Sequence, residues 1–233
     1  MRLINFFSDF FSLIFPNQCE ACGGLLPLRE HIICATCRRK MPYTGYCQQQ
    51  GNPMEQSFRL HAPVENVCAL FFVGKKTPYS RLVHQLKYHS KPYIGVALGQ
   101  ELGNELAKVA AYSDVDFIIP IPLHAKRERK RGYNQSERIA AGISLSTGKP
   151  VRTDVVLRQR YNETQTKKNR EERSINVSGI FAVHPEVAPE LLGKHILLVD
   201  DVLTTGSTVA SCIGAILSAA SCRVSVATLG VAV

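Results

Sequence analysis

Two adjacent carboxylates, Asp200 and Asp201, stand directly before a turn that is rich in hydroxyl groups. The turn holds four hydroxyl side chains and one glycine: Thr204, Thr205, Gly206, Ser207 and Thr208. At the start of a helix, such a turn offers hydroxyl donors, free N–H groups and partial positive charge, which together suit a phosphate monoester. The carboxylates would repel a phosphate and suit sugar hydroxyls instead. The segment therefore predicts a site for a ribose 5-phosphate.

A simpler interpretation is that the aspartates cap the turn and that the hydroxyl residues merely begin a helix. A helix N-cap uses a single side-chain oxygen. This segment has four hydroxyls after two adjacent acids, which exceeds what capping requires. The phosphate-site interpretation accounts for all of these residues and is favoured.

The elements that position this segment follow an alternation of strands and helices. The apolar run 196–199 before the two acids is typical of a strand buried on both faces of a parallel sheet. Apolar positions from Val209 to Ala220 then form one helical face. Further strands are predicted at 67–73, 117–120, 151–157 and 224–229, and further helices at 79–88, 96–111 and 135–145. The pattern predicts an open, mostly parallel α/β sheet that binds its ligand beyond the carboxyl ends of the strands.

Near the amino terminus, four cysteines form two Cys-x2-Cys pairs separated by 11 residues: Cys19, Cys22, Cys34 and Cys37. Two such pairs supply four thiolates in a tetrahedron, the geometry of a structural zinc ion. A site with four cysteine ligands leaves no open position for water or substrate, so a catalytic role is not expected. Disulfides are the alternative, but they require an oxidising compartment and no export signal is visible.

Composition divides the chain into a zinc-binding part, 1–62, and a larger α/β part, 63–233. Residues 2–15 are expected to form an amphipathic helix packed on the body, and the polar stretch 43–63 to complete the zinc module and link it to the sheet. The chain has no window of 18 uninterrupted apolar residues. The 2–15 helix has too few cations for interfacial anchoring. We therefore expect a cytoplasmic protein with no stable membrane insertion.

Charge is concentrated in one region of the chain. The 233 residues are 45% hydrophobic and 20% charged, which excludes disorder for the bulk of the chain. The chain carries 28 Lys and Arg against 19 Asp and Glu, a net charge of +9. Between His124 and Arg173, 14 basic residues face six acidic ones, so +8 of the total lies there. Such an excess indicates an anionic partner, either nucleic acid or a small anionic substrate.

The segment from Asp200 to Thr208 closely resembles the signature with which type I phosphoribosyltransferases bind phosphoribosyl pyrophosphate (PRPP). Other segments are similar to motifs of the ComF family within that superfamily: Pro120–Leu123, Arg127, Arg131–Gln135, Arg158, Arg160, Gln165, Arg173, Asn176 and Phe181. That family also carries an amino-terminal four-cysteine module, so the resemblance covers nearly the whole chain. It implies a type I phosphoribosyltransferase-like sheet flanked by helices and preceded by a small zinc-ribbon-like module.

The resemblance implies a reaction in which an acceptor displaces pyrophosphate from the anomeric carbon of PRPP, with magnesium as the metal ion. Asp200 and Asp201 would bind the ribose hydroxyls, and residues 204–208 the 5′-phosphate. Candidates for the pyrophosphate loop and the loop that closes over it are Pro122, Leu123, Arg127, Arg131, Arg158, Arg160, Gln165 and Arg173. Lys87 matches a ComF-type motif, but charge and position assign it no role, and a solvated helix lysine is the alternative.

The acceptor is unknown. We expect its pocket in the region 79–93 with the zinc module lying over it. No residue can be named as the general base from the sequence. Glu128 and Glu163 are candidates, but neither sits in a recognisable constellation, and an ordinary solvated carboxylate is the favoured interpretation of each. Three hypotheses follow: a PRPP-dependent phosphoribosyltransferase, a non-catalytic accessory protein of DNA uptake and natural transformation that binds single-stranded DNA, and a protein that binds PRPP as a signal without turnover.

Overall fold

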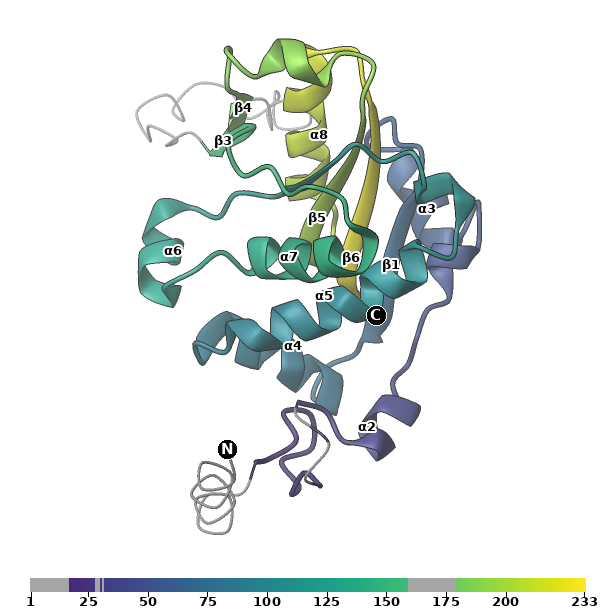
Figure 1. Ribbon diagram of the computed structural model, residues 1–233, viewed down its shortest axis with the longest axis vertical. Helices are drawn as coiled ribbons and strands as arrows, with labels where there is room; N and C mark the ends of the chain where they lie inside the picture. The colour runs from purple at the N-terminus through teal and green to yellow at the C-terminus, as the bar shows by residue number, and fades with distance from the viewer. Residues whose placement is uncertain (1–16, 28–29, 31, 159–178) are drawn as a thin grey trace, which may run out of the picture.

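A four-stranded parallel sheet forms the centre of the protein (Figure 1). The computed structural model describes residues 17–27, 30, 32–158 and 179–233. The strand order is β1 (Val67–Val73), β6 (Arg223–Ala232), β5 (His195–Leu203) and β2 (Phe117–Pro120). Pro120 at the end of β2 pairs with Val199 of β5. Parallel pairing therefore places the carboxyl end of β2 beside Asp200 and Asp201.

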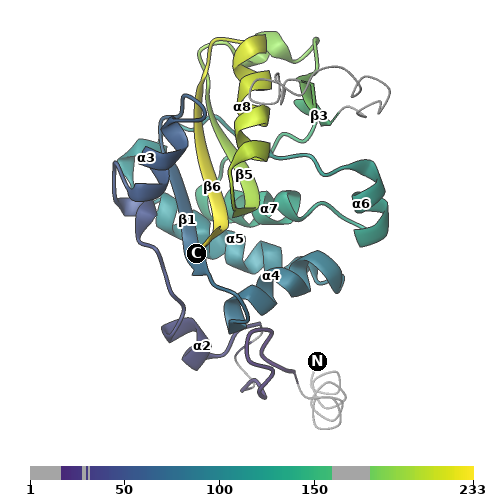
Figure 2. The same cartoon turned by 180° about the vertical axis from the view of Figure 1, so that it is seen from behind.

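Helices cover both faces of this sheet (Figures 1 and 2). Side chains alternate between the faces along a strand, and β5 follows this rule. Leu197 and Val199 pack with α4 (Pro78–Tyr88), α5 (Pro92–Leu106) and α7 (Gln135–Thr147), whereas Ile196 and Leu198 pack with α8 (Ser207–Ala219). Burial on two faces explains the continuous apolar run and confirms the predicted fold class.

Helices α5 and α7 cross at a close contact between glycines. A Cβ atom on Gly142 would lie 2.1 Å from the Val96 carbonyl oxygen and 2.8 Å from the Gly99 Cα. The absence of side chains lets the two backbones touch. This contact packs α7, whose first turn carries Ser136, closely against α5.

Two predicted elements differ from the structure. The predicted strand 151–157 is wrong in extent, because only Val151 bridges β2 before the chain bends and forms β3 (Val156–Arg158). The bend is closed by Arg152, whose guanidinium donates to both Asp154 oxygens at 2.8 Å. Strand β3 pairs antiparallel with β4 (Phe181–Val183). The predicted helix 96–111 instead begins at Pro92, where proline suits the first turn, and ends at Leu106, before the 3-10 turn η2 (Ala110–Tyr112).

The segment predicted as a linker contains regular structure. It includes η1 (Tyr46–Gln48) and α3 (Pro53–Arg59), whose N-cap Asn52 accepts from the Glu55 N–H. The amide of Asn52 also donates to the Val67 carbonyl oxygen at 2.8 Å. This buried bond fixes α3 against the start of β1. The stretch between the cysteine module and the sheet is therefore part of the packed body.

The shorter helices complete the described fold. Helix α2 (Ala35–Arg39) belongs to the cysteine module, α6 (Ala125–Arg131) follows β2, and η4 (Ala188–Leu191) precedes β5. Within the described ranges, no helix is both long and apolar enough to cross a membrane. The predicted helix at 2–15 lies outside the described residues.

Candidate functional site

The two adjacent acids at the end of β5 lie in different environments. Asp200 Oδ1 accepts from Ser136 Oγ at 3.0 Å and from the Asp201 N–H at 2.9 Å. Burial raises the pKa of the Asp200 carboxyl to about 7, and the neighbouring charge of Asp201 contributes to this rise. The neutral form of Asp200 is therefore favoured more than in an exposed carboxyl.

Asp201 is paired with a lysine from a distant segment. Lys87 Nζ lies 2.9 Å from Asp201 Oδ1, and the two side chains are 24% and 13% exposed. Lys87 is on the last turn of α4, where Tyr133 Oη donates to the Leu86 carbonyl oxygen. Lys87 is therefore part of the site. Sequence spacing could not show this, because the two partners are far apart in the chain and only the motif match singled out Lys87.

The turn after β5 leads directly into α8. Gly206 is the N-cap of α8 with φ +74°, a left-handed conformation that glycine adopts without steric cost. A Cβ atom at Gly206 would also lie 2.7 Å from Phe58 Cε2 on α3. Gly206 is buried, whereas its hydroxyl neighbours at 204, 205, 207 and 208 are exposed. The free N–H groups and hydroxyls at this helix start can bind a phosphate.

Basic side chains lie at the end of β2, beside the two acids. Pro122 and Leu123 follow the strand and are half-buried. Arg158 Nη1 donates to the Pro122 carbonyl oxygen at 3.4 Å, a long hydrogen bond. Burial lowers the pKa of Arg158, and the positive charge of Arg127 lowers it further. The charge of Asp200 acts in the opposite direction and raises the pKa of Arg158. The positive charge of the two arginines suits an anionic ligand.

Other predicted residues stand in different places. Arg131 Nη1 donates to Gln135 Oε1 at 2.6 Å, at the junction of α6 and α7. Arg160, Gln165, Arg173 and the general-base candidate Glu163 lie outside the described residues. The other candidate, Glu128, is exposed on α6.

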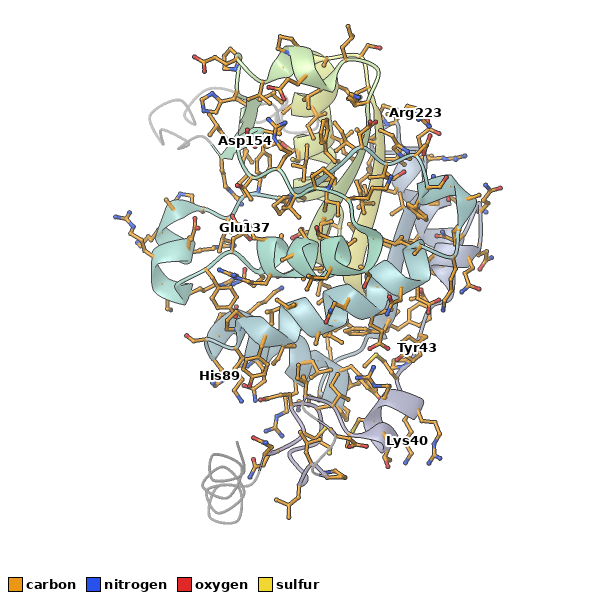
Figure 3. The ribbon with its side chains drawn as sticks, in the orientation of Figure 1. Lys40, Tyr43, His89, Glu137, Asp154 and Arg223 are labelled. Carbon is orange, nitrogen blue, oxygen red and sulfur yellow. The ribbon has the colours of Figure 1, made fainter. Side chains whose placement is uncertain are left out.

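Glu137 on the first turn of α7, labelled in Figure 3, has its pKa raised by burial and by the charge of Glu128. No motif or spacing in the sequence singles out Glu137.

The four cysteines of the amino-terminal module converge. The Sγ atoms of Cys19, Cys22, Cys34 and Cys37 all lie within 4.8 Å of one another. Backbone N–H groups of residues 24, 34 and 37 donate to these sulfurs at 3.3–3.4 Å. Four thiolates around zinc at Zn–S distances of about 2.3 Å require such spacing. The donor set and its hydrogen bonds fit a structural zinc ion that would close the module.

Contacts between this module and the helices lead toward the site. Tyr79 Oη on α4 donates to the Cys37 carbonyl oxygen at 3.0 Å. Glu20, between two zinc ligands, accepts from Lys91 Nζ at 2.8 Å and from Tyr93 Oη. Tyr43, labelled in Figure 3, donates to Glu101 on α5. The module therefore contacts the first turn of α4 and the start of α5, on either side of the last α4 turn that carries Lys87.

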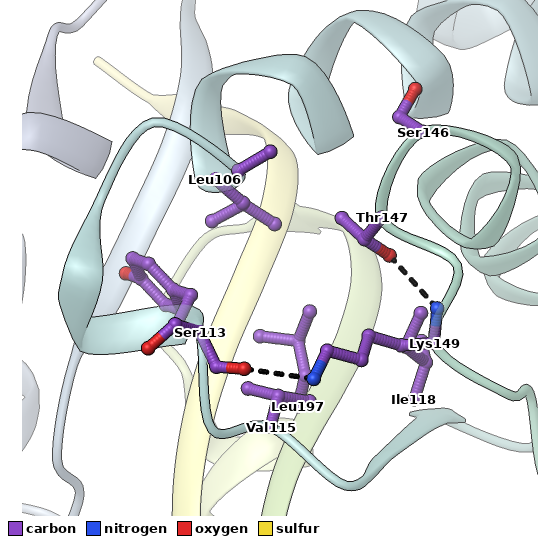
Figure 4. Close-up of a pocket in the computed structure, with 10 residues that line it drawn as sticks. Leu106, Ser113, Val115, Ile118, Ser146, Thr147, Lys149 and Leu197 are labelled. Carbon is purple, nitrogen blue, oxygen red and sulfur yellow. Dashed lines mark hydrogen bonds between the residues drawn. The ribbon is translucent and has the colours of Figure 1, made fainter.

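The amino-terminal end of the sheet contains other polar groups and a cavity, but neither resembles this site. His195 lies 2.7 Å from Asp114 Oδ1 and 2.8 Å from Ser225 Oγ. Ser225 and His195 are 0% and 1% exposed, so substrate cannot reach the hydroxyl. A cavity of about 210 Å³ near Ile118 and Leu197 is mainly apolar, and Lys149 at its rim donates to the Ser113 carbonyl oxygen (Figure 4).

The parallel sheet, the acids before the α8 turn and the cysteine module together define a class: a phosphoribosyltransferase-type domain joined to a zinc ribbon. The Phosphoribosyl transferase domain family matches residues 101–230, and the Double zinc ribbon domain family matches residues 10–69. The chain belongs to the ComF family of competence and DNA-utilization proteins.

The relatives cover most of the chain. The DNA utilization protein YhgH of Salmonella typhimurium is 30% identical over 85% of this chain and 89% of its own length. Competence protein F of Haemophilus influenzae is 26% identical over 83% of this chain and 88% of its own. Competence protein ComFC of Bacillus subtilis is 32% identical over 53% and 47%, respectively.

Proposed function

We propose that this protein binds PRPP with magnesium and transfers its phosphoribosyl group to an acceptor. The observation that carries the proposal is the order of groups along one edge of the sheet. The hydroxyl-rich start of α8 comes directly after Asp200 and Asp201, and Arg127 and Arg158 flank the turn after β2 beside them. These groups suit the 5′-phosphate, the ribose hydroxyls and the pyrophosphate, respectively.

In the proposed reaction, a lone pair of the acceptor forms a bond to the anomeric carbon. The bond from that carbon to pyrophosphate breaks, and its electron pair leaves with the pyrophosphate, while the acceptor loses its proton to solvent or a base. Asp200 and Asp201 orient the ribose, and the arginines stabilise the charge that develops on the leaving group. The oxygen donors at this edge suit a hard cation, and magnesium bound with PRPP supplies further charge neutralisation.

Calorimetric titration with PRPP and magnesium tests the binding step. We expect the Asp200→Ala/Asp201→Ala variant to bind PRPP more weakly than the wild type. Each lost hydrogen bond to a charged acceptor should cost roughly 1.5–3 kcal/mol of binding free energy, which is about ten- to a hundredfold in affinity for each bond. Asp154→Ala is the matched control, because this exposed acid pairs with Arg152 away from the turn. Equal affinity in the double variant and the wild type would contradict the proposal.

Turnover is a separate measurement. Release of pyrophosphate in the presence of candidate acceptors supports transfer. Saturable PRPP binding with no release for any acceptor supports instead the hypothesis of a PRPP sensor. A thermal-shift screen of acceptors with PRPP present ranks the candidates, since binding to the folded state stabilises it increasingly as ligand excess grows.

Direct binding of single-stranded DNA is a second candidate function. It is favoured by α6, which has no buried residue and whose seven positions include five cations: Lys126, Arg127, Arg129, Lys130 and Arg131. It also agrees with the names of the relatives that refer to competence and DNA utilization. Contacts to phosphates should make the affinity fall steeply with salt concentration. An affinity that stays flat between low and moderate salt would exclude such contacts.

A further inference from the structure

A basic pocket lies beside the proposed PRPP site, between the end of α4 and helix α6. Its volume is about 290 Å³. Figures 1 and 2 both show α6 standing out from the body on the side where α4 ends. The pocket is lined by Lys87, Tyr88, Ser90, Arg127, Lys130 and Arg131. Three of these residues, Lys87, Tyr88 and Ser90, belong to the region 79–93 in which the acceptor pocket is expected.

The charged residues that line this pocket are all basic. Four of its six lining residues are cations, and none is an acid. Lys87 is paired with Asp201, and Arg131 bonds to Gln135, a neutral group. In the part of the chain that the structure describes, Arg127 and Lys130 form neither an ion pair nor a side-chain hydrogen bond. Cations gathered around one pocket, with no acid among the lining residues, favour an anionic ligand.

Contacts within the protein order part of the pocket wall. Ser90 has φ +51°, a left-handed conformation that is uncommon outside glycine and concentrates at functional sites. The next residue, Lys91, bonds to Glu20 of the zinc module at 2.8 Å. On the other wall, the Arg131 guanidinium lies 5.2 Å from the centre of the Tyr88 ring. Such prior ordering lowers the entropic cost of binding.

The pocket overlaps the pyrophosphate turn only in part. Lys87 lines the pocket and contacts Asp201, so the pocket adjoins the ribose end of the proposed PRPP site. Arg127, a proposed pyrophosphate contact, lines the pocket, whereas Arg158 and Pro122 at the turn after β2 do not. We infer that this pocket binds a phosphate ester carried by the acceptor. This inference rests on the proposed function and adds the chemical class of the second substrate.

The test uses the full-length protein and a phosphorylated probe. With the PRPP site saturated by PRPP and magnesium, binding of adenosine 5′-monophosphate is compared with binding of adenosine by calorimetry. We expect the nucleotide to bind at least about tenfold more tightly, because charge-assisted hydrogen bonds are the strong ones. Equal affinity of the two probes would overturn the inference.

Two lysines of α6 provide a matched pair of variants. Lys130 lines the pocket and Lys126 does not, and both are exposed, so neither substitution should affect folding. Lys130→Ala should weaken the nucleotide about three- to tenfold and leave the affinity for PRPP unchanged, whereas Lys126→Ala should change neither by more than about twofold. Equal effects of the two variants would show only general attraction by α6, and overturn the inference.

A third measurement tests whether the pocket binds the pyrophosphate leaving group instead of the acceptor. If Lys130→Ala weakens PRPP and inorganic pyrophosphate instead of the nucleotide, the pocket belongs to the leaving group and the inference is wrong. If wild-type protein does not bind PRPP, the proposed function fails. In that case, the lysine comparison on PRPP-free protein still decides whether the pocket takes a phosphate.

Discussion

The zinc module and the carboxyl edge of the sheet differ in how fully their charged groups are paired or hydrogen-bonded. In the module, the sulfurs receive backbone N–H groups, and Glu20 is bound by Lys91 and Tyr93. At the sheet edge, Lys87 pairs with Asp201, but burial opposes the charge of Asp200, and the charge of Arg127 opposes that of Arg158. A region whose charges are all satisfied serves structure, whereas one in which some charges lack a partner is prepared for a ligand that brings the missing partners.

Removing zinc tests the structural side of this comparison and should have the largest effect. Cys37→Ser takes away one of four ligands, and we expect loss of zinc and unfolding of the module, a cost of several kcal/mol, because metal binding and folding are linked in such modules. Zinc content and thermal unfolding measure the outcome. Cys222→Ser is the control, since Cys222 lies outside the four-cysteine cluster. A variant that keeps full zinc would contradict the assigned ligand set.

Gly206→Ala tests whether the turn before α8 depends on its close contact with Phe58 of α3. The substitution places a Cβ atom at φ +74° and 2.7 Å from Phe58 Cε2. We expect a loss of about 2–3 kcal/mol of unfolding free energy, since the strained backbone costs about 1–2 kcal/mol and the clash adds to it.

Gly148→Ala isolates the backbone component. Gly148 has φ +71°, but nothing lies within 4 Å of the position that a Cβ atom would take there, so only the conformational cost of about 1–2 kcal/mol applies. Denaturant unfolding measures both variants. If the two substitutions lower the unfolding free energy by the same amount, the contact with Phe58 does not constrain the turn.

The two aspartates should respond differently to substitution at pH 8. Asp200 has a folded-state pKa of about 7, above the unfolded value, so its contribution to stability is complete below about pH 4 and is lost as the pH rises to about 7. Asp200→Asn removes that loss and should raise the unfolding free energy at pH 8 on the order of 1–3 kcal/mol. Asp201→Asn breaks the pair with Lys87 but also removes a charge that raises the pKa of Asp200, so it should change the unfolding free energy by less than about 1 kcal/mol.

Thermal unfolding from pH 4 to pH 8 measures these changes. Both asparagine variants should also bind PRPP more weakly. A wild-type profile without the predicted fall, or an Asp200→Asn variant that is less stable at pH 8, would show that Asp200 carries no unfavourable charge.

The smallest effect should come from the contacts that connect the two regions. Glu20 of the module accepts hydrogen bonds from Lys91 and Tyr93, at the start of α5 and close in sequence to Lys87. Glu101, in the second half of α5, accepts from Arg38 and Tyr43 of the module. We expect Glu20→Gln to weaken PRPP binding about threefold, which is less than 1 kcal/mol, and Glu101→Gln to leave it unchanged. Calorimetry on zinc-replete protein measures both. Equal affinities would mean that the module does not position Lys87.

Several parts of the fold could be predicted because their signals are local. The apolar run of β5, the face of α8 and the two Cys-x2-Cys pairs need only neighbouring residues to be recognised, and the structure confirms them. The extent of the strand predicted at 151–157 was wrong, because the side chains of Arg152 and Asp154 close a bend there. Helix α3 was missed because its short, polar sequence has no clear period.

By itself, the sequence determined the kinds of chemistry available: four thiolates at zinc-ligand spacing, and two acids before a hydroxyl-rich helix start. Only the tertiary structure decided which distant groups meet them. It placed Lys87 against Asp201, Ser136 against Asp200 and Phe58 against Gly206. The physical reason is that spacing along a helix or strand reports neighbours on one element, whereas these partners come from separate elements that only sheet pairing and helix packing bring together.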